Sequence, residues 1–254
     1  MKNLNEELTS NSILISLENN ILTIALNRED KLNALTCAMY TDFSRCLNYA
    51  SNTSSIRAVI ISSTSSNFTA GNDIADFINH PDLNNEHPVV VFLKILANFD
   101  KPLLACVQGA AVGIGTTLLF HCDFVFADPS AYFHMPFVHL GLVPEAGSSY
   151  LLPLITNRNT ANELLLLGRK IDAQKASDCG IIGELCQEPL KKTLEVANEI
   201  AHLPKSAVFE TKKLLKAPIQ SVLDKTIAME LAVFSKQLAS DEAKFAFAKF
   251  MSKT

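Results

Sequence analysis

The feature that most constrains the fold of this chain is a change in pattern along its length. Up to about residue 159, short β-rich apolar runs such as Arg57–Ser63 alternate with segments of helical spacing such as Ala34–Ala50. Beyond that point almost every segment has helical spacing. Alternation of this kind is typical of α/β proteins, and a helical end must pack on the α/β part or on another subunit. The sequence therefore predicts an α/β body followed by a helical C-terminal region.

The boundary between the two parts is predicted near Leu203 and Pro204. Proline disfavours helical backbone at the residue before it, and this pair separates two segments of helical spacing. We therefore predict an α/β core over residues 1–203 and a helical C-terminal region over residues 204–254.

The C-terminal region is predicted to contain several separate helices. Helical spacing is present in Ser206–Lys216 and again from about Ile219 to Met251, and Ser240 is an N-cap signal that divides the second stretch in two. The apolar residues of this stretch fall on more than one helix face. Because large exposed apolar patches are unusual on monomers, these helices are expected to cover the body or to be covered by another subunit.

Composition and charge narrow the class of protein and of partner. The chain has 254 residues, of which 48% are hydrophobic and 19% charged, as in an ordinary globular domain. Its net charge of −4 gives no general basic field, so no nucleic-acid partner is expected. No apolar run reaches the roughly 18 residues of a membrane span, so no membrane-spanning segment is expected.

Cysteine spacing and the two ends of the sequence bear on its location. The six cysteines include no C-x-x-C pair, and residues 1–12 contain no apolar segment of the signal-peptide kind. Both features favour reduced thiols and a cytoplasmic location. The last three residues, Ser-Lys-Thr, differ from the peroxisomal Ser-Lys-Leu signal at the final position, so they are not interpreted as one.

Several motifs that would carry chemistry are missing from the sequence. The glycine-rich run Gly109–Thr117 matches neither the dinucleotide-binding nor the P-loop pattern and contains no lysine for a phosphate. His134 and His139 lack an H-E-x-x-H frame and a third ligand nearby, so they are interpreted as structural and no metal site is predicted. No G-x-S-x-G segment is present, which argues against a serine hydrolase.

One acid, Glu145, lies in the otherwise apolar window His139–Pro153, HLGLVPEAGSSYLLP. Taken alone, this window favours a helix start, where an acid in the first turn adds roughly 0.3–1 kcal/mol. The alternative is a base held in a dry pocket. An apolar wall would raise the pKa of the carboxyl by desolvation, whereas a following helix N-terminus would lower it. The sequence leaves open which effect prevails.

Three segments in a fixed order carry a family resemblance. They are LNREDKLNAL at Leu26–Leu35, NFTAGNDIADF at Asn67–Phe77, and Val107–Pro153, which holds the glycine-rich run and Glu145. Together they resemble the crotonase superfamily of enoyl-CoA hydratases and isomerases, from about Asn11 to the C-terminus. The resemblance implies a crotonase-like spiral of ββα units with a helical C-terminal region that builds homo-trimers or hexamers. It also implies an acyl-CoA thioester substrate and no separate cofactor, since coenzyme A is part of the substrate.

The resemblance further implies an oxyanion hole of two backbone N–H groups, assigned by position to Ala70 and Ile114. A thioester that becomes an enolate gains negative charge on its carbonyl oxygen, and one fixed donor is typically worth about 2.7–4 kcal/mol. Gly71 and Gly113 suit a backbone that turns sharply beside a ligand. Relatives often carry glycine where Ile114 stands, so this donor requires a backbone without positive φ there.

Contacts to coenzyme A are implied for two of the segments. The residues at positions where relatives bind the nucleotide are Asp30, Lys31 and Leu32, and then Ala70, Gly71, Asn72, Asp73 and Ile74. Arg28 and Lys31 are candidate phosphate partners, although exposed cations on a loop are more often solvated. Asp73 is expected to cap or brace the following helix rather than to touch substrate.

The two acids of the hydratases are missing from this sequence. Hydratases of the superfamily hold and activate water with two glutamates, and alignment places Thr117 and Phe137 at those positions. Phenylalanine cannot transfer a proton, so water activation by paired carboxylates is not available there. Thr117, Phe137 and Leu142 are expected to line the acyl pocket. A single acid after the proline, Glu145, instead resembles the Δ3,Δ2-enoyl-CoA isomerases of the peroxisomal type.

The resemblance therefore implies an isomerase in which Glu145 carries one proton. It would take the proton from C2 of a 3-enoyl-CoA and return it to C4, so that the double bond moves into conjugation with the thioester. The alternatives are a hydratase with displaced acids, another crotonase-type acyl-CoA enzyme such as a dehalogenase or hydrolase, and an acyl-CoA-binding module without catalysis. Acyl chain length is not readable from these residues.

Overall fold

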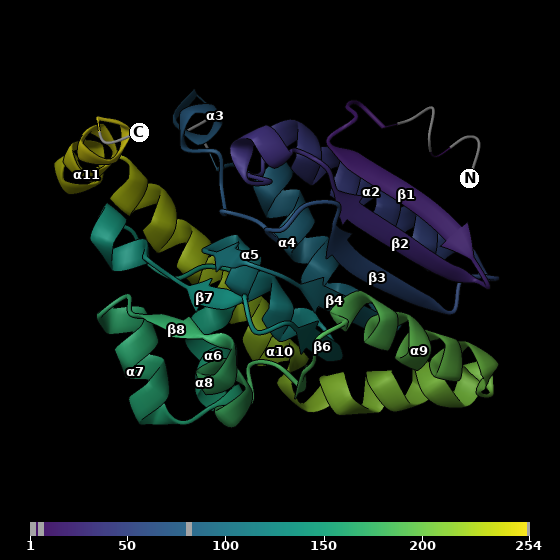
Figure 1. Cartoon of the computed structure of the whole chain (residues 1–254). Helices are drawn as coiled ribbons and strands as arrows, with labels where there is room; N and C mark the ends of the chain where they lie inside the picture. The colour runs from purple at the N-terminus through teal and green to yellow at the C-terminus, as the bar shows by residue number, and fades with distance from the viewer. Residues whose placement is uncertain (1–3, 5–7, 80–82, 253–254) are drawn as a thin grey trace.

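The computed structural model describes residue 4, residues 8–79 and residues 83–252. Its centre is a six-stranded sheet in the order β1-β2-β3-β4-β6-β9 (Figure 1). β1 and β2 pair antiparallel and all the other neighbours in this sheet are parallel. Its strands are β1 (Ile13–Glu18), β2 (Ile21–Leu26), β3 (Ala58–Ser63), β4 (Leu103–Val107), β6 (Phe124–Ala127) and β9 (Glu184–Leu185).

A second, three-stranded sheet has the order β5-β7-β8. Its strands are β5 (Ala110–Val112), β7 (Tyr132–His134) and β8 (Lys170–Asp172). The helices that follow and cover the two sheets are η1 (Glu29–Lys31), α2 (Cys37–Asn52), α3 (Ile74–Asn79), α4 (Pro88–Asn98), α5 (Ile114–Thr117), η2 (Leu118–His121), η3 (Phe137–Leu140), α6 (Ser148–Ile155), α7 (Arg158–Leu166), α8 (Ala173–Asp178), α9 (Pro189–His202), α10 (Lys205–Leu238) and α11 (Asp241–Met251).

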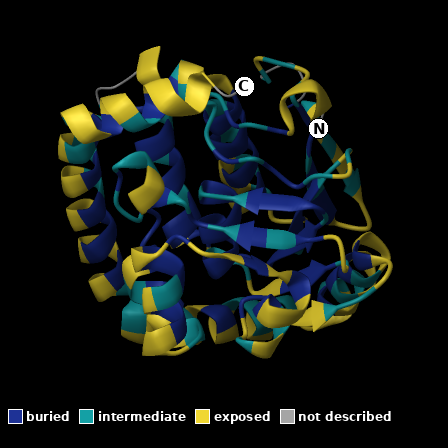
Figure 2. Ribbon diagram, turned by 60° about the vertical axis from the view of Figure 1, so that its left-hand side comes forward, coloured by how far each residue is buried: buried dark blue, intermediate teal, exposed yellow. Residues whose placement is uncertain are grey.

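Local sequence explains how the sheet starts and how its faces are covered. Asn19 and Asn20, between β1 and β2, both have positive φ (50° and 64°), which asparagine tolerates in a tight hairpin turn. Along β3, alternate side chains point to opposite faces. Ile60 joins a smaller core under α9, whereas Val59 and Ile61 join the main core. Figure 2 shows the result, with buried strands at the centre and helices exposed on their outer sides.

The predicted α/β body followed by a helical end is confirmed, with two corrections. Short strands β8 and β9 lie beyond residue 159, in a part of the chain predicted to be helical. The two helices predicted at Ser206–Lys216 and from Ile219 form one helix, α10, with Pro218 inside it. Proline removes one backbone hydrogen bond. The helix nevertheless continues, and beyond the proline its buried side chains pack in the main core.

The predicted N-cap at Ser240 is confirmed, since its hydroxyl accepts a hydrogen bond from the N–H of Ala243 at the start of α11. Helix α10 begins at Lys205, directly after the boundary predicted at Leu203 and Pro204. Within the described ranges, no helix is both long enough and apolar enough to span a bilayer. Residues 253 and 254, which complete the C-terminal tripeptide, lie outside the described residues.

Candidate functional site

A small hollow lies where the loop after β3, helix α5, the turn η3 and the C-terminal helices meet. Its volume is about 100 Å³, and most of its lining is apolar. One wall is backbone, from Ala70–Asn72 and from Gly113 and Ile114. Phe137 and Leu142 line it as predicted, together with Ile74. The structure therefore brings the second and third sequence segments to one place.

The loop before α3 is held by hydrogen bonds that use most of its N–H groups. The Ala70 N–H donates to the carbonyl of Leu32 at 2.9 Å, and the Gly71 N–H to the hydroxyl of Thr69 at 3.0 Å. The Asp73 N–H donates to the carbonyl of Leu35, also at 2.9 Å. Asn72 N–H is the exception: no acceptor for it exists among the residues that the structure describes.

The expectation that Ala70 supplies a free donor is therefore wrong. Leu32 has a left-handed backbone (φ 49°), and its carbonyl accepts the hydrogen bond of Ala70. The neighbouring donor, Asn72 N–H, lines the hollow instead. Gly71 is required between them, because it has a φ of 92° and a Cβ there would lie 2.7 Å from the carbonyl oxygen of Val112.

The N–H of Ile114, the other predicted donor, has no acceptor within the described part of the chain. Gly113 turns the backbone with a φ of 56°, and its carbonyl accepts the N–H groups of Thr116 and Thr117. Ile114 itself is the first residue of α5 and has no positive φ. An isoleucine can therefore stand here, where relatives often carry glycine. The unpaired backbone donors of the site thus include those of Asn72 and Ile114.

Glu145 is buried, with 5% of its surface exposed. Its carboxyl accepts a hydrogen bond of 2.5 Å from the hydroxyl of Thr117, at the end of α5 opposite to Ile114. Thr117 and Ile114 are three residues apart on this one-turn helix, so their backbone positions are about 4.5 Å apart along its axis. Thr117 is therefore placed beside the acid, although it is not part of the hollow's lining.

Desolvation prevails over the helix N-terminus in setting the proton affinity of this acid. Burial raises the pKa of Glu145 from 4.5 to about 8, the hydrogen bond from Thr117 opposes the rise, and the carboxyl of Glu230 adds to it. Helix α6 begins at Ser148, and the N–H groups at its start, those of Gly147 and Ser149, donate to Glu230. The helix start is therefore occupied by the other acid.

The residues predicted to contact coenzyme A lie on two neighbouring loops. Asp30, Lys31 and Leu32 are exposed around η1, and the bridge between Leu35 and Asn72 joins their loop to the second segment. Asp73 braces its helix as predicted, because its carboxylate accepts the N–H of Asp76.

Arg28 is held inside the protein rather than offered to a phosphate. Its guanidinium contacts the carboxylate of Asp73 at 2.8 Å and the carbonyl of Ala34 at 2.9 Å. The ion pair also lowers the pKa of Asp73, against the opposing effect of its burial. Of the two candidate phosphate partners, Lys31 is the exposed one.

Sequence reasoning missed three groups near the site. The phenol of Tyr40, on α2, donates to the side-chain oxygen of Asn72. His121 and Glu230 contact the segment that carries Glu145. No short motif marks these residues. They come from distant helices, and only the tertiary fold brings them together.

The C-terminal helices cover the hollow of their own chain. Phe234 on α10 and Phe247 and Phe250 on α11 all line it. Gly141, at the end of η3, lies directly under α11, where a Cβ would stand 2.8 Å from the backbone nitrogen of Ala243. The predicted C-terminal region is therefore part of the site.

Comparison with known proteins identifies the family. The family description "Enoyl-CoA hydratase/isomerase" matches residues 16–254. The chain belongs to the enoyl-CoA hydratase/isomerase family. It is 32% identical over 251 residues to the human protein "Enoyl-CoA delta isomerase 2", covering 95% of this chain and 64% of that relative. It is also 32% identical over 253 residues to the mouse protein "Enoyl-CoA delta isomerase 3, peroxisomal", covering 95% and 78%.

Among solved structures, Pseudomonas aeruginosa OdaA has a TM-score of 0.93 and 42% sequence identity, covering 95% of this chain and 99% of that one. The match supports the crotonase-like fold expected from the three segments. This member of the enoyl-CoA hydratase/isomerase family spans 64% of the length of its human relative.

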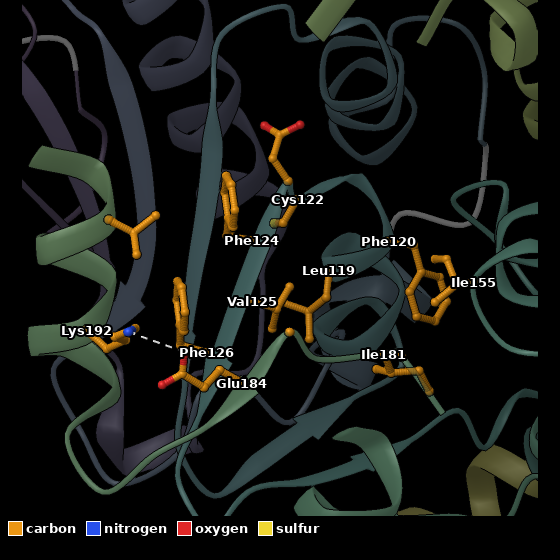
Figure 3. A pocket seen from close by; sticks show the side chains of 14 residues that line it. Leu119, Phe120, Cys122, Phe124, Val125, Phe126, Ile155, Ile181, Glu184 and Lys192 are labelled. Carbon is orange, nitrogen blue, oxygen red and sulfur yellow. Dashed lines mark ion pairs between the residues drawn. The ribbon is translucent and has the colours of Figure 1, made fainter. Parts of the chain in front are cut away.

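A second hollow lies away from this site, beside β6 and α9. Its volume is about 540 Å³, and stacked Phe124 and Phe126 form part of its lining (Figure 3). Its charged groups include Lys192 and Glu184, which pair at 3.3 Å. Neither free backbone donor nor Glu145 lines it. In the described residues no group of three or more His, Cys, Asp or Glu side chains is arranged to hold a metal ion.

The raised pKa of Glu145 predicts a pH-dependent stability. Its folded-state pKa of about 8 exceeds the ordinary value of 4.5, so the native state binds more protons than the unfolded state between these values. The stabilising contribution is complete below the unfolded pKa and is lost as the pH rises through the folded pKa. Glu145→Gln should remove this loss, so its melting temperature relative to wild type should rise from about pH 5 to about pH 9.

Thermal unfolding followed by circular dichroism measures this difference. The exposed Glu242→Gln on α11 is the control and should follow wild type at every pH. A Glu145→Gln curve parallel to that of wild type would show that the carboxyl is not buried in the folded protein.

Proposed function

We propose that this protein is a Δ3,Δ2-enoyl-CoA isomerase, which moves the double bond of a 3-enoyl-CoA to the 2-position. The observation that carries the proposal is a single proton carrier, Glu145. It does not itself line the hollow, but it is hydrogen-bonded to Thr117 on α5, the short helix whose first residue, Ile114, does. Thr117 and Phe137 occupy the positions of the two water-handling acids of hydratases. The other buried acid nearby, Glu230, has both oxygens occupied by hydrogen bonds from Gly147 and Ser149. One available carboxylate suits a proton shuttle without water.

In this reaction the thioester oxygen accepts hydrogen bonds from Asn72 N–H and Ile114 N–H. The carboxylate of Glu145 removes a proton from C2, and the electron pair of that bond moves toward the carbonyl oxygen to form a dienolate. The protonated acid then gives its proton to C4, and the electrons return to form the C2–C3 double bond. Atoms and charge balance without water, metal or redox partner.

The electrostatics of the site support both halves of this reaction. A carbon acid is weak, and a base with a pKa near 8 removes its proton more readily than an ordinary carboxylate does. Two fixed N–H groups in a water-poor hollow stabilise the developing oxyanion at no reorganisation cost, each worth about 2.7–4 kcal/mol. Two relatives named enoyl-CoA delta isomerases, human and mouse, add to this support.

Coenzyme A is proposed to lie along the two loops joined at Leu35 and Asn72. The exposed turn Asp30–Leu32 would flank the nucleotide, and Ala70–Ile74 would flank the pantetheine end that leads to the thioester. Lys31 is the proposed phosphate partner, because the charge of Arg28 is already paired with Asp73.

The decisive variant is Glu145→Gln. It keeps the shape and burial of the side chain but cannot carry a proton between C2 and C4. The isomerase rate on a 3-enoyl-CoA should fall about 10²–10⁴-fold, while acyl-CoA binding stays near that of wild type. Rates are followed by the absorbance of the conjugated product and binding by calorimetry. Glu242→Gln is the surface control, and an unchanged rate in Glu145→Gln would overturn the proposal.

We also propose that the protein is a homo-trimer, alone or paired into a hexamer. Large apolar side chains lie exposed on α10, where a neighbouring subunit would cover them: Leu214, Leu215, Val222, Met229 and Val233. The cytoplasmic location and the division at residue 203 stay predictions.

Light scattering of the purified protein tests the assembly. The expected mass is three or six times the 27.8 kDa of one chain. The exposed apolar side chains on α10 favour association between subunits. A single species with the mass of one chain would contradict the trimer. Helix α11 would then cover only the site of its own chain.

A further inference from the structure

We propose that Glu230, on α10, is a positioning residue for Glu145, which it controls through the backbone of the segment Glu145–Ser149. The proposal rests on the proposed function and deepens it. Glu230 touches neither the hollow nor the reacting atoms, since it does not line the hollow and its carboxylate contacts only Gly147 and Ser149 among the described residues.

The segment after Glu145 forms a tight turn, in which the Ser148 N–H donates to the carbonyl of Glu145 at 3.0 Å, and its backbone is strained. Ala146 has a φ of 59° and Gly147 a φ of 72°, so two successive residues are left-handed. A non-glycine residue in this region persists only where the surrounding structure fixes it. Helix α10 also packs directly on this backbone, because a Cβ on Gly147 would lie 2.3 Å from the side chain of Leu223.

Two side chains from different helices, Glu230 on α10 and His121 on η2, fix this backbone. Glu230 accepts the Gly147 N–H at 2.6 Å, the Ser149 N–H at 2.9 Å and the Ser149 hydroxyl at 2.5 Å. The ring of His121 bonds the carbonyl of Ala146 at 2.7 Å. Burial lowers the pKa of His121 to about 4, so the ring is neutral and its Nε2–H is the donor.

Glu230 requires an ionised carboxylate for this arrangement. Three donors point at its two oxygens, and both oxygens must accept. Burial raises its pKa, while the hydrogen bonds from Ser149 and Gly147 lower it. A glutamine has one oxygen and one NH₂ group, so one donor of the segment would face another donor. Glu230→Gln therefore breaks part of the contact with almost no change in shape.

The same contacts set the surroundings of the Glu145 carboxyl. The polar and titratable groups that face it are the hydroxyl of Thr117 from α5, the phenol of Tyr40 from α2 and the carboxylate of Glu230 from α10. The phenol is neutral, because burial raises the pKa of Tyr40 well above its ordinary value. Glu230 is thus the one negative charge among them, and it occupies the N–H groups that would otherwise stabilise an ionised Glu145.

Removing Glu230 should therefore make Glu145 a weaker base in a looser position. The like charge disappears and the helix start becomes available, and both changes lower the pKa of Glu145. The segment also loses a contact that fixes its backbone. The acid limb of the pH–rate profile should move to lower pH. Because misplacement by about 1 Å can cost on the order of 10²-fold, kcat should fall up to that amount while KM changes little.

The test compares wild type, Glu230→Gln and the control Glu210→Gln, which removes an exposed carboxylate from the same helix. Infrared titration of the buried carboxyl gives the pH midpoint of Glu145 protonation without any enzymatic turnover. The Glu145 signal is identified by its absence from the spectrum of Glu145→Gln. The midpoint is expected near pH 8 in wild type and in Glu210→Gln, and at lower pH in Glu230→Gln. Kinetics on a 3-enoyl-CoA then give kcat, KM and the acid limb for the same proteins.

An unmoved midpoint in a folded Glu230→Gln protein overturns the proposal, whatever reaction the enzyme catalyses. A wild type without isomerase turnover instead overturns the proposed function, and the infrared midpoint still decides the role of Glu230. If Glu230→Gln does not fold, Glu230→Asp replaces it. Aspartate keeps the charge but is one methylene shorter, so a reduced kcat with unchanged KM supports positioning, and wild-type kcat contradicts it.

Discussion

Burial of the Glu145 carboxyl is the interaction on which the rest of this site depends. An isolated acid in an apolar setting is costly when ionised, and among the described residues one hydrogen bond, from Thr117, offsets part of that cost. The result is a group that holds its proton up to a pKa of about 8. A carboxyl of this kind is a poor surface charge and a poor ion-pair partner, but it suits transfer of a proton to and from carbon.

The backbone donors follow from how the two loops are joined. Short parallel bridges, Leu35 with Asn72 and Thr69 with Ala111, tie the loop before α3 to its neighbours. These bridges and the adjacent hydrogen bonds use the N–H groups on either side of Asn72, so its own N–H is the one left pointing away from them. The turn at Gly113 likewise leaves the N–H of Ile114 without an acceptor among the described residues. Unpaired donors therefore come from the pairing pattern together with the two glycine turns, at Gly71 and Gly113.

Much of this was predictable from sequence, and the errors have physical causes. The N-cap at Ser240 and the brace at Asp73 are short-range features, and each was predicted correctly. The free donor was placed at Ala70 instead of Asn72, because the choice depends on a hydrogen bond from the Ala70 N–H to the carbonyl of Leu32, which lies nearly forty positions earlier in the chain.

Separate helices were predicted on either side of Pro218, at Ser206–Lys216 and from Ile219, but the packing of α10 on the main core outweighs one missing backbone bond. Glu230 had no sequence signal, since a single acid on a long helix is ordinary until the fold places it under the segment that follows Glu145.

We propose that one buried acid moves a proton between two carbons and does not add water. This is tested most directly by supplying purified protein with a 3-enoyl-CoA and, separately, with a 2-enoyl-CoA, and by separating the products by chromatography. We expect conversion of the 3-enoyl to the 2-enoyl isomer, with little or no 3-hydroxyacyl product from the 2-enoyl substrate. Hydration at a rate comparable to isomerisation, or no isomerisation at all, would contradict it.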